Sequence, residues 1–425
     1  MKKIVSSILM TTMLAGAVCA CTPNIPPEDP PVISYSNEPV AVEIKELSAD
    51  SMDQYRKAYL NASFDLLKTQ FEDKQNVMIS PASIMIALSM TEAGAKGNTK
   101  TQMATLWGGA EDPDAQMSYA AEMLKKLNNA QGVKLHAADS MWVNEQNLVG
   151  LIKGEFVDFV SKNFDAEVVN LLFNNAAVDR MNAWVKEKTD NMIDKIIDEL
   201  PGDAALVLLN AISFDGKWAE QYDSYQVSEE EFTNASNNKQ PAQMLNCSLS
   251  NYLENDKATG FIKYYEGGQY AFVVMLPKDQ SQNADQMLAD FTGDDFDKYM
   301  NSVSHEYTVH TKLPEFQYDY GNSLKEALIK LGVTDAFDYD TVDFTGIGEY
   351  DDGRKLLIAD VLHKTHIEVD RNGTKAAAVT AVVQEAAGAI IDDNAKEVYC
   401  NRPFAYAIVD TTDNTPIFLG TVNNL

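Results

Sequence analysis

Motifs of the common enzyme families are missing from this sequence. It has no Gly-x-Ser-x-Gly nucleophile elbow, no glycine-rich phosphate loop and no His-Glu-x-x-His zinc helix. His363 and His366 are separated by an odd number of positions, so on a strand they would point to opposite faces, and no cysteine is close to them in the sequence. We therefore predict a protein that is not an enzyme and that has no metal site and no cofactor.

Cysteines and basic residues are scarce. Only four cysteines are present, and 34 basic residues stand against 63 acidic ones, which gives a formal net charge of −29. Nucleic acid and heparin-like polyanions are poor candidate partners, because a strongly acidic protein repels them. Cys247 and Cys400 are the cysteines beyond residue 21. The sequence leaves open whether these two form a disulfide in an oxidising compartment.

The first 20 residues have the features of a secretory leader. Lys2 and Lys3 precede an apolar stretch over residues 4–18, and a small residue, Ala20, comes directly before Cys21. An apolar run too short to span a bilayer, followed by this cleavage pattern, is typical of a bacterial lipoprotein that is acylated on Cys21. An ordinary signal peptide with a cut nearby is the alternative. Removal of residues 1–20 takes away two lysines and moves the net charge from −29 to −31.

Residues 21–45 are predicted to be the lipidated cysteine and a tether. The stretch contains six prolines, which favour an extended and semi-rigid chain. No later stretch approaches the length of a membrane-spanning helix. We therefore expect a folded domain over residues 46–425, held by lipid in a bacterial cell envelope. The outer membrane is the expected location, with the domain periplasmic or exposed to the extracellular side.

Apolar periodicity predicts a mixture of helices and strands in this domain. Helical spacing is found over residues 51–72, 83–91, 175–199 and 323–332. Strand patterns are found over residues 135–143, 205–214 and 270–276. Separated helices and strands without an internal repeat fit an α+β fold.

The segment 373–380 has side chains that are nearly all small or β-branched. As a strand it would point Thr374, Ala376, Ala378 and Thr380 to one face, and Lys375, Ala377 and Val379 to the other. The first face is compact and uncharged, so it could slide between two strands of an existing sheet. Alanine also has the highest helix propensity, and local sequence alone leaves a surface helix as an equal alternative.

This segment closely resembles the hinge of the serpin reactive loop, and four other motifs resemble serpin signatures in matching order and spacing. The motifs are Ser80-Pro81 within residues 76–84, followed by Gly94-Ala95-Lys96-Gly97; Asn210 with residues 214–218; residues 361–364; residues 373–380; and Arg402-Pro403-Phe404 with residues 418–420. The resemblance covers roughly residues 46 to 425. It implies three β-sheets, about eight or nine helices and an exposed reactive loop at about residues 371–393.

The resemblance also implies where the reactive bond lies. The hinge would consist of Gly373, Thr374, Ala376, Ala377, Ala378 and Thr380. Counting from Gly373, as serpins are usually counted, places the reactive bond between Ala387 and Gly388, with Ala386 and Ile390 as alternates. No proline interrupts residues 381–393, so the whole stretch could join a sheet as an interior strand.

Five residues outside the loop acquire roles from the same resemblance. It implies that His363 hydrogen-bonds to Asn210 near Ser80 and Ser83, beneath the central sheet where strands part to admit the loop. Trp218 would lie at the end of the sheet where insertion starts. The plainer readings are a satisfied buried polar cluster and a core tryptophan, and the first of these overlaps with the functional role, since such networks are costly to break.

Two positions depart from the family pattern. Serpins commonly have acidic residues at the positions of Arg371 and Lys375, and both are basic in this chain. Lys375 and Val379 both fall on the outward face of the hinge. On that face the long cationic side chain of Lys375 can reach water. The effect of Arg371 is left open.

The resulting hypothesis is a monomeric, lipid-anchored suicide inhibitor of endopeptidases. Ala387 is small, which suits the shallow pockets of elastase-like and subtilisin-like serine proteases and of papain-like cysteine proteases. A non-inhibitory serpin that binds a small ligand or a protein is one alternative. A surface adhesin or structural lipoprotein is the other.

Overall fold

A computed structural model describes residues 42–144, 152–200, 204–350, 353–374 and 394–425. Within these ranges the helices are α1 (Ala49–Thr69), α2 (Pro81–Glu92), α3 (Gly97–Leu106), α4 (Pro113–Asn128), α5 (Gly154–Phe164), α6 (Asn175–Lys188), α7 (Ala284–Leu288), α8 (Gly293–Met300) and α9 (Lys325–Lys330). Among the helices described, none has the length and apolar content needed to cross a bilayer.

The strands form three sheets. From edge to edge, the central sheet consists of β11 (Phe316–Ser323), β12 (Ile358–Val369), β13 (Gly373–Thr374), β4 (Leu206–Lys217), β2 (Val133–Asn144) and β3 (Glu167–Leu171). The second sheet, again from edge to edge, consists of β1 (Val77–Ile79), β16 (Thr415–Val422), β15 (Phe404–Asp410), β9 (Tyr270–Pro277), β8 (Ala258–Tyr264) and β7 (Tyr252–Glu254). The third sheet is β14 (Ala395–Tyr399), β10 (Thr308–Pro314), β6 (Lys239–Leu249) and β5 (Val227–Thr233). The predicted α+β fold with three sheets is confirmed.

Most predicted elements are present, but the helix expected over residues 175–199 is wrong in its second half. Helix α6 ends at Lys188. Asp190 and Asn191 then have φ angles of 52° and 62°, a left-handed conformation that stops a right-handed helix. The apolar residues beyond this point, including Ile193 and Ile197, are buried without being helical.

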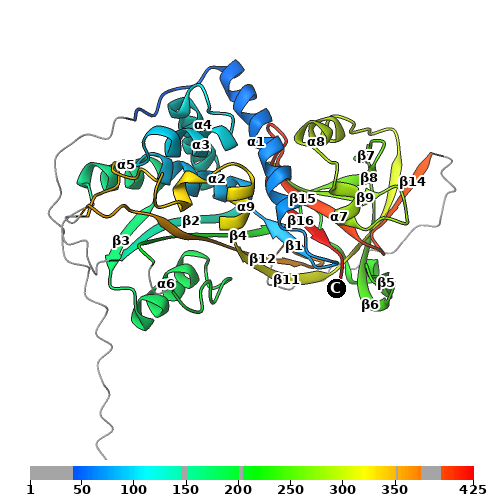
Figure 1. The fold of residues 1–425 in the computed structure, drawn as a ribbon. Coiled ribbons are helices and arrows are strands. Elements are labelled where there is room, and N and C mark those ends of the chain that lie inside the picture. Colours follow the sequence, from blue (N-terminus) through cyan, green and yellow to red (C-terminus); the bar gives the residue numbers. More distant parts are fainter. Residues whose placement is uncertain (1–41, 145–151, 201–203, 351–352, 375–393) are drawn as a thin grey trace, which may run out of the picture. The chain divides into compact units, whose positions relative to one another are not determined.

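Helices cover both faces of the central sheet (Figure 1). On one face, α6 packs its Met181 and Val185 against strands β2 and β4. On the other face lies α2, all twelve residues of which are buried. Ser80 caps this helix and Pro81 occupies its first turn, where the missing N–H of proline is not needed. The central sheet is therefore a middle layer, and any strand added to it must fit between two packed surfaces.

The central sheet is closed along part of its length and open at one end. Strands β12 and β4 pair directly and in parallel, from Ile358 with Leu206 to Thr365 with Ile212. Beyond Thr365 the short strand β13 lies between them, antiparallel to both. Two parallel strands that separate at one end leave unpaired backbone N–H and C=O groups. β13 pairs with some of the separated positions, at Val369 on β12 and at Gly216 and Lys217 on β4.

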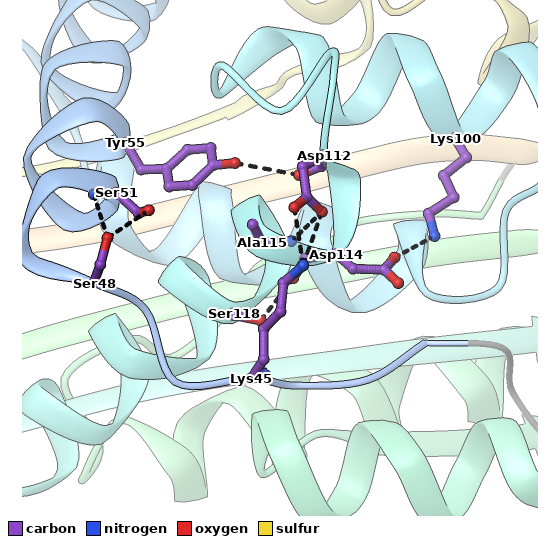
Figure 2. A network of polar contacts seen from close by, with 9 residues as sticks. All are labelled: Lys45, Ser48, Ser51, Tyr55, Lys100, Asp112, Asp114, Ala115 and Ser118. Atoms are coloured by element: carbon purple, nitrogen blue, oxygen red, sulfur yellow. Dashed lines mark hydrogen bonds and ion pairs between the residues drawn. The ribbon is translucent and has the colours of Figure 1, made fainter.

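The folded domain extends a few residues into the predicted tether. Val42 and Ile44 pack against the core, and the backbone N–H of Lys45 donates to the Ser118 hydroxyl of α4 at 3.1 Å. Figure 2 shows the Lys45 ammonium against the carboxylate of Asp112, at 2.9 Å, where that carboxylate caps α4. The alternation of Val42 and Ile44 with charged residues allows this edge contact, so residues 42–45 pack with the folded domain.

Candidate functional site

The first two residues of the predicted hinge lie inside the central sheet. Gly373 pairs with Lys217 and Thr374 pairs with Gly216 on β4, while Thr374 also pairs with Val369 on β12. The strand interpretation of the hinge therefore holds for Gly373 and Thr374. Residues 375–393 lie outside the described part of the chain, and so do Lys375, Ala376, Ala377, Ala378, Thr380, Ala386, Ala387, Gly388 and Ile390.

Glycine at position 373 is required by the close approach of β4. A Cβ atom at Gly373 would lie 2.1 Å from the carbonyl oxygen of Gly216 and 2.7 Å from Cα of Lys217. Both atoms belong to the backbone, so neither can move without shifting the strand. The sequence motif thus has a steric reason: a side chain at this position would push the hinge out of the sheet.

Thr374 shows which face of the hinge points into the protein. Its side chain is 1% exposed, and its hydroxyl lies 2.6 Å from the hydroxyl of Tyr265 on the core side of the sheet. Burial raises the pKa of Tyr265, so this phenol stays protonated and available for hydrogen bonding. Even-numbered hinge residues that continued the strand would face the same way, because side chains alternate.

Trp218 lies at the entry to the gap and binds the turn that precedes the hinge. Its ring stacks on Tyr265 at 4.7 Å between ring centroids. Its backbone N–H donates to the carbonyl of Asn372 and its indole N–H donates to the carbonyl of Asp370, each at 2.9 Å. The tryptophan is completely buried, so it is both a core residue and part of the entry site.

Arg371 has an acidic neighbour, Glu315, directly before β11. Its backbone N–H donates to Glu315 Oε1 at 3.3 Å. Burial raises the pKa of Glu315, and the backbone hydrogen bond from Arg371, followed by the charge of Arg371, opposes that rise. Asp370 and Glu368 already raise the pKa of Glu315 by charge, so an acidic residue at position 371 would add to that repulsion, whereas Arg371 opposes it.

A buried polar network joins three strands of the central sheet to α2. The backbone N–H of Ser80 donates to His363 Nε2 at 3.1 Å, so Nδ1 carries the imidazole proton and donates to Asn210 Oδ1 at 2.6 Å. Ser80 Oγ donates to the carbonyl of Ile417 and accepts the N–H of Ser83. The structure thus brings together His363, Asn210, Ser80 and Ser83, and a strand entering between β12 and β4 would have to break the His363–Asn210 hydrogen bond.

Asp139 is a member of this network that the sequence analysis missed. The Asn210 amide donates to Asp139 Oδ1 at 2.5 Å, and Asp139 lies directly opposite Asn210 on β2. A signal was present, because Asp139 is in phase with Leu135, Met141 and Val143 on the core side of a strand. An acid at such a position must be neutral or hydrogen-bonded.

The two titratable groups of the network are both shifted towards neutrality. Burial raises the pKa of Asp139 from 3.8 to about 7, and its hydrogen bond from Asn210 opposes the rise. Burial lowers the pKa of His363 from 6.5 to about 3. Asp139 therefore disfavours folding as pH rises from about 4 to 7, since the unfolded chain loses its proton first. His363 disfavours folding as pH falls from 6.5 towards 3, since the unfolded chain gains a proton first.

These opposite trends lead to a testable pH dependence. Between about pH 4 and 6.5 the effects of Asp139 and His363 on the pH dependence of the free energy of unfolding cancel. Asp139→Asn removes the first effect, so the stability of the variant should show the pH dependence of His363 alone. Relative to wild type, the variant should gain stability at about 1.4 kcal/mol per pH unit between pH 4 and 7, to a total of about 4 kcal/mol. Urea unfolding midpoints at half-unit pH intervals would measure this difference.

Asp319→Asn is the matched control for the pH series. Asp319 lies on β11 and pairs with His366 of β12 at 2.6 Å, but the Asp319 side chain is 61% exposed. This change should therefore alter stability by less than about 1 kcal/mol. A stability difference between Asp139→Asn and wild type that stays constant from pH 4 to 8 would contradict the assignment.

His363 and His366 point to opposite faces of β12, as their spacing predicts. His363 is 1% exposed within the buried network, whereas His366 contacts Asp319 at the surface. In the described ranges, no group of three or more His, Cys, Asp or Glu side chains is placed to hold a metal ion.

Cys247 and Cys400 are both free thiols. They lie on β6 and directly after β14, on either side of β10. Two strand spacings separate their backbones by at least about 9 Å, which exceeds the reach of a disulfide. The question that the sequence left open is therefore answered against a bond between them.

The chain belongs to the serpin family. The family model for serpins, described as serine protease inhibitors, matches residues 57–425. An uncharacterized serpin-like protein of Methanosarcina acetivorans is 29% identical, with 98% of each chain covered. Iripin-5 of Ixodes ricinus is 30% identical over 88% of this chain and 95% of the relative.

Solved structures of a thermophilic serpin, tengpin, have the same fold. The native-state structure has a TM-score of 0.83 at 36% identity, with 92% of this chain and 98% of tengpin covered. The latent-state structure has a TM-score of 0.76 at 32% identity, with 90% and 100% covered.

Proposed function

We propose that this serpin is a suicide inhibitor of serine endopeptidases, with papain-like cysteine proteases as a second target class. The observation that carries the proposal is the position of Gly373 and Thr374, which lie in the gap between β12 and β4. Four residues further along each strand, from Thr365 on β12 and Ile212 on β4, the two strands are paired with each other. Residues that follow Thr374 could therefore extend β13 between β12 and β4 only if these two strands separated.

The proposed reaction begins as ordinary proteolysis. The protease nucleophile attacks the carbonyl carbon of Ala387, the amine of Gly388 leaves, and an acyl link joins the enzyme to Ala387. The freed strand then extends β13, and about 14 residues at roughly 3.3 Å each would carry the enzyme on the order of 45 Å. Serpin loop insertion is a known case of strain that is stored in the native fold and released by cleavage. Distortion of the displaced enzyme would stop hydrolysis of the acyl link.

The buried polar network supports this proposal because it gives the closed sheet a barrier. Breaking the His363–Asn210 hydrogen bond without replacement would leave buried donors and acceptors unsatisfied, which costs about 1–3 kcal/mol for each group. The sheet would therefore stay closed until a long strand is free to enter. A non-inhibitory serpin needs no such path, although it could retain the residues.

One experiment separates the proposal from its alternatives. The purified chain is incubated with elastase-like, subtilisin-like, chymotrypsin-like and papain-like proteases and then analysed on denaturing gels. We expect a covalent band with an enzyme that has a shallow pocket, and mass spectrometry should place its acyl link at Ala387. Active-site-blocked protease is the control. Cleavage without any complex would favour a binding protein, and no loop cleavage at all would favour a structural lipoprotein.

We also propose that Cys21 carries a lipid that anchors the protein in the cell envelope. The leader pattern and the six prolines of residues 21–45 support this assignment. Cys21→Ala should move the protein from the membrane fraction to the soluble fraction and abolish labelling by a radioactive or alkyne fatty acid. Cys19→Ala is the matched control, because Cys19 lies two residues earlier and would be removed with the leader. A lipid-labelled Cys21→Ala protein would contradict the proposal.

A further inference from the structure

Lys263 is a buried cation close to the loop-entry site. It lies on β8 and is 4% exposed. Its ammonium donates to the backbone carbonyl of Glu220 at 2.9 Å. In the part of the chain that the structure describes, no carboxylate lies within ion-pair distance of this ammonium. A buried charge with a single carbonyl partner needs further stabilisation.

Two aromatic rings supply that stabilisation. The Lys263 ammonium is 4.1 Å from the ring centroid of Tyr222 and 5.5 Å from that of Trp218, both within the range of cation–π attraction. Burial lowers the pKa of Lys263, while Cys247 and Glu220 oppose the fall. Lys263 thus contacts Trp218, Glu220 and Tyr222, which are alternate residues of one segment. We call residues 218–222 the receiving segment.

The receiving segment binds the turn that leads into the hinge. Trp218 holds the carbonyls of Asp370 and Asn372 through its two N–H groups. The backbone N–H of Tyr222 donates to the carbonyl of Arg371 at 2.9 Å. All three carbonyls of the turn 370–372 are therefore held by Trp218 and Tyr222, the same two residues whose rings face Lys263.

We infer that Lys263 is a positioning residue for loop insertion. Lys263 holds the receiving segment in place through its contacts with Trp218, Glu220 and Tyr222. The receiving segment in turn holds the turn 370–372, so that Gly373 and Thr374 stay between β12 and β4. Among the described residues, Lys263 reaches the turn 370–372 and the start of the hinge only through Trp218 and Tyr222. The inference deepens the proposed inhibitory function and rests on it for its biological meaning, but the positioning itself can be tested separately.

Amide hydrogen exchange tests the positioning without any protease. In the full chain, Lys263→Met keeps a long unbranched side chain and removes the charge. We expect the Trp218 and Tyr222 amides, which donate to the turn, to exchange at least tenfold faster than in wild type. Lys263→Arg should retain protection, because a guanidinium also stacks on aromatic rings. Lys278→Met, at a lysine that pairs with Glu254 near the surface, is the matched control and should match wild type.

The result for Lys263→Arg separates positioning from general destabilisation. Unchanged exchange in Lys263→Met, or equal loss of protection in the Met and Arg variants, would overturn the inference. Should Lys263→Met fail to fold, Tyr222→Leu provides a second variant. It removes one of the two rings and should speed exchange at the Trp218 amide, and an unchanged rate there would also overturn the inference.

Inhibition kinetics then test the consequence. With a susceptible protease, Lys263→Met should raise the stoichiometry of inhibition at least threefold, because a delayed start of insertion lets more acyl-enzyme hydrolyse. The rate of initial acylation should remain unchanged, since the reactive bond is untouched. Equal stoichiometries for Lys263→Met and wild type would contradict the role in insertion. If wild type forms no covalent complex with any protease, the proposed function fails, while the exchange experiment still decides the role of Lys263.

Discussion

A single cut between Ala386 and Gly388 is expected to raise the thermal unfolding midpoint of this protein. The central sheet has a closed seam where Ile358–Thr365 of β12 pairs with Leu206–Ile212 of β4, and the cut would free a strand to enter it. About 14 added residues, at roughly 1 kcal/mol for each new hydrogen bond, give stabilisation on the order of 10 kcal/mol. At about 2 °C for each kcal/mol, the midpoint should rise by roughly 20 °C.

Circular dichroism melts of the cut and uncut protein measure this shift. Most nicked proteins lose stability, because the cut increases the conformational freedom of the unfolded chain. The matched control is Ala376→Arg cut at the same bond, which should gain much less because the arginine obstructs insertion. A midpoint that falls after cleavage of wild type would favour the non-inhibitory alternatives.

Local sequence was enough to predict most of the elements around the site. The run over residues 270–276 is apolar throughout and became β9, whose eight residues are all buried. The Ser80-Pro81 pair predicted the start of α2, since serine caps the helix and proline fits its first turn. The helix predicted over residues 189–199 is absent. The apolar spacing there reflected burial and not helical structure, and the backbone conformation of Asp190 and Asn191 ended the helix.

Buried charges were the part of the site that the sequence did not predict. Asp139 and Lys263 each interrupt an apolar strand, but the sequence alone does not say whether such a residue faces the core. The partners come from distant segments: Asn210 for Asp139, and Trp218 with Tyr222 for Lys263. Only the folded arrangement of β2, β4 and β8 brings these residues together, so their roles follow from tertiary structure and not from a motif.

The register of β13 predicts where each later hinge residue would land. Thr374 lies opposite Gly216 on β4 and opposite Val369 on β12, and both pairings are antiparallel. Six residues further on, Thr380 would therefore lie opposite residue 216 − 6, which is Asn210, and residue 369 − 6, which is His363. The Thr380 hydroxyl would enter at the hydrogen bond between these two side chains, where it could both donate and accept in place of the bond it breaks.

Arginine substitutions in the hinge should therefore differ by face. Thr380→Arg would place a charge between Asn210 and His363, and Ala376→Arg would place one between Phe214 and Ile367, both of which lie in the core. Burying such a charge costs at least several kcal/mol. Loop insertion should therefore become slower than hydrolysis of the acyl link. We expect the stoichiometry of inhibition to rise at least tenfold in both variants, which would then behave as substrates.

Ala377→Arg is the matched control for these variants, because it lies between them in sequence and would face the opposite side. In the same register it would lie opposite buried Ser213 on β4 and opposite His366 on β12. His366 contacts Asp319, whose side chain is 61% exposed, so a guanidinium that extends along this pair could reach water. This variant should keep much of its inhibitory activity. Stoichiometries against one susceptible protease are the only measurement needed. Equal losses at positions 376, 377 and 380, or no loss at any of them, would rule out strand insertion in this register.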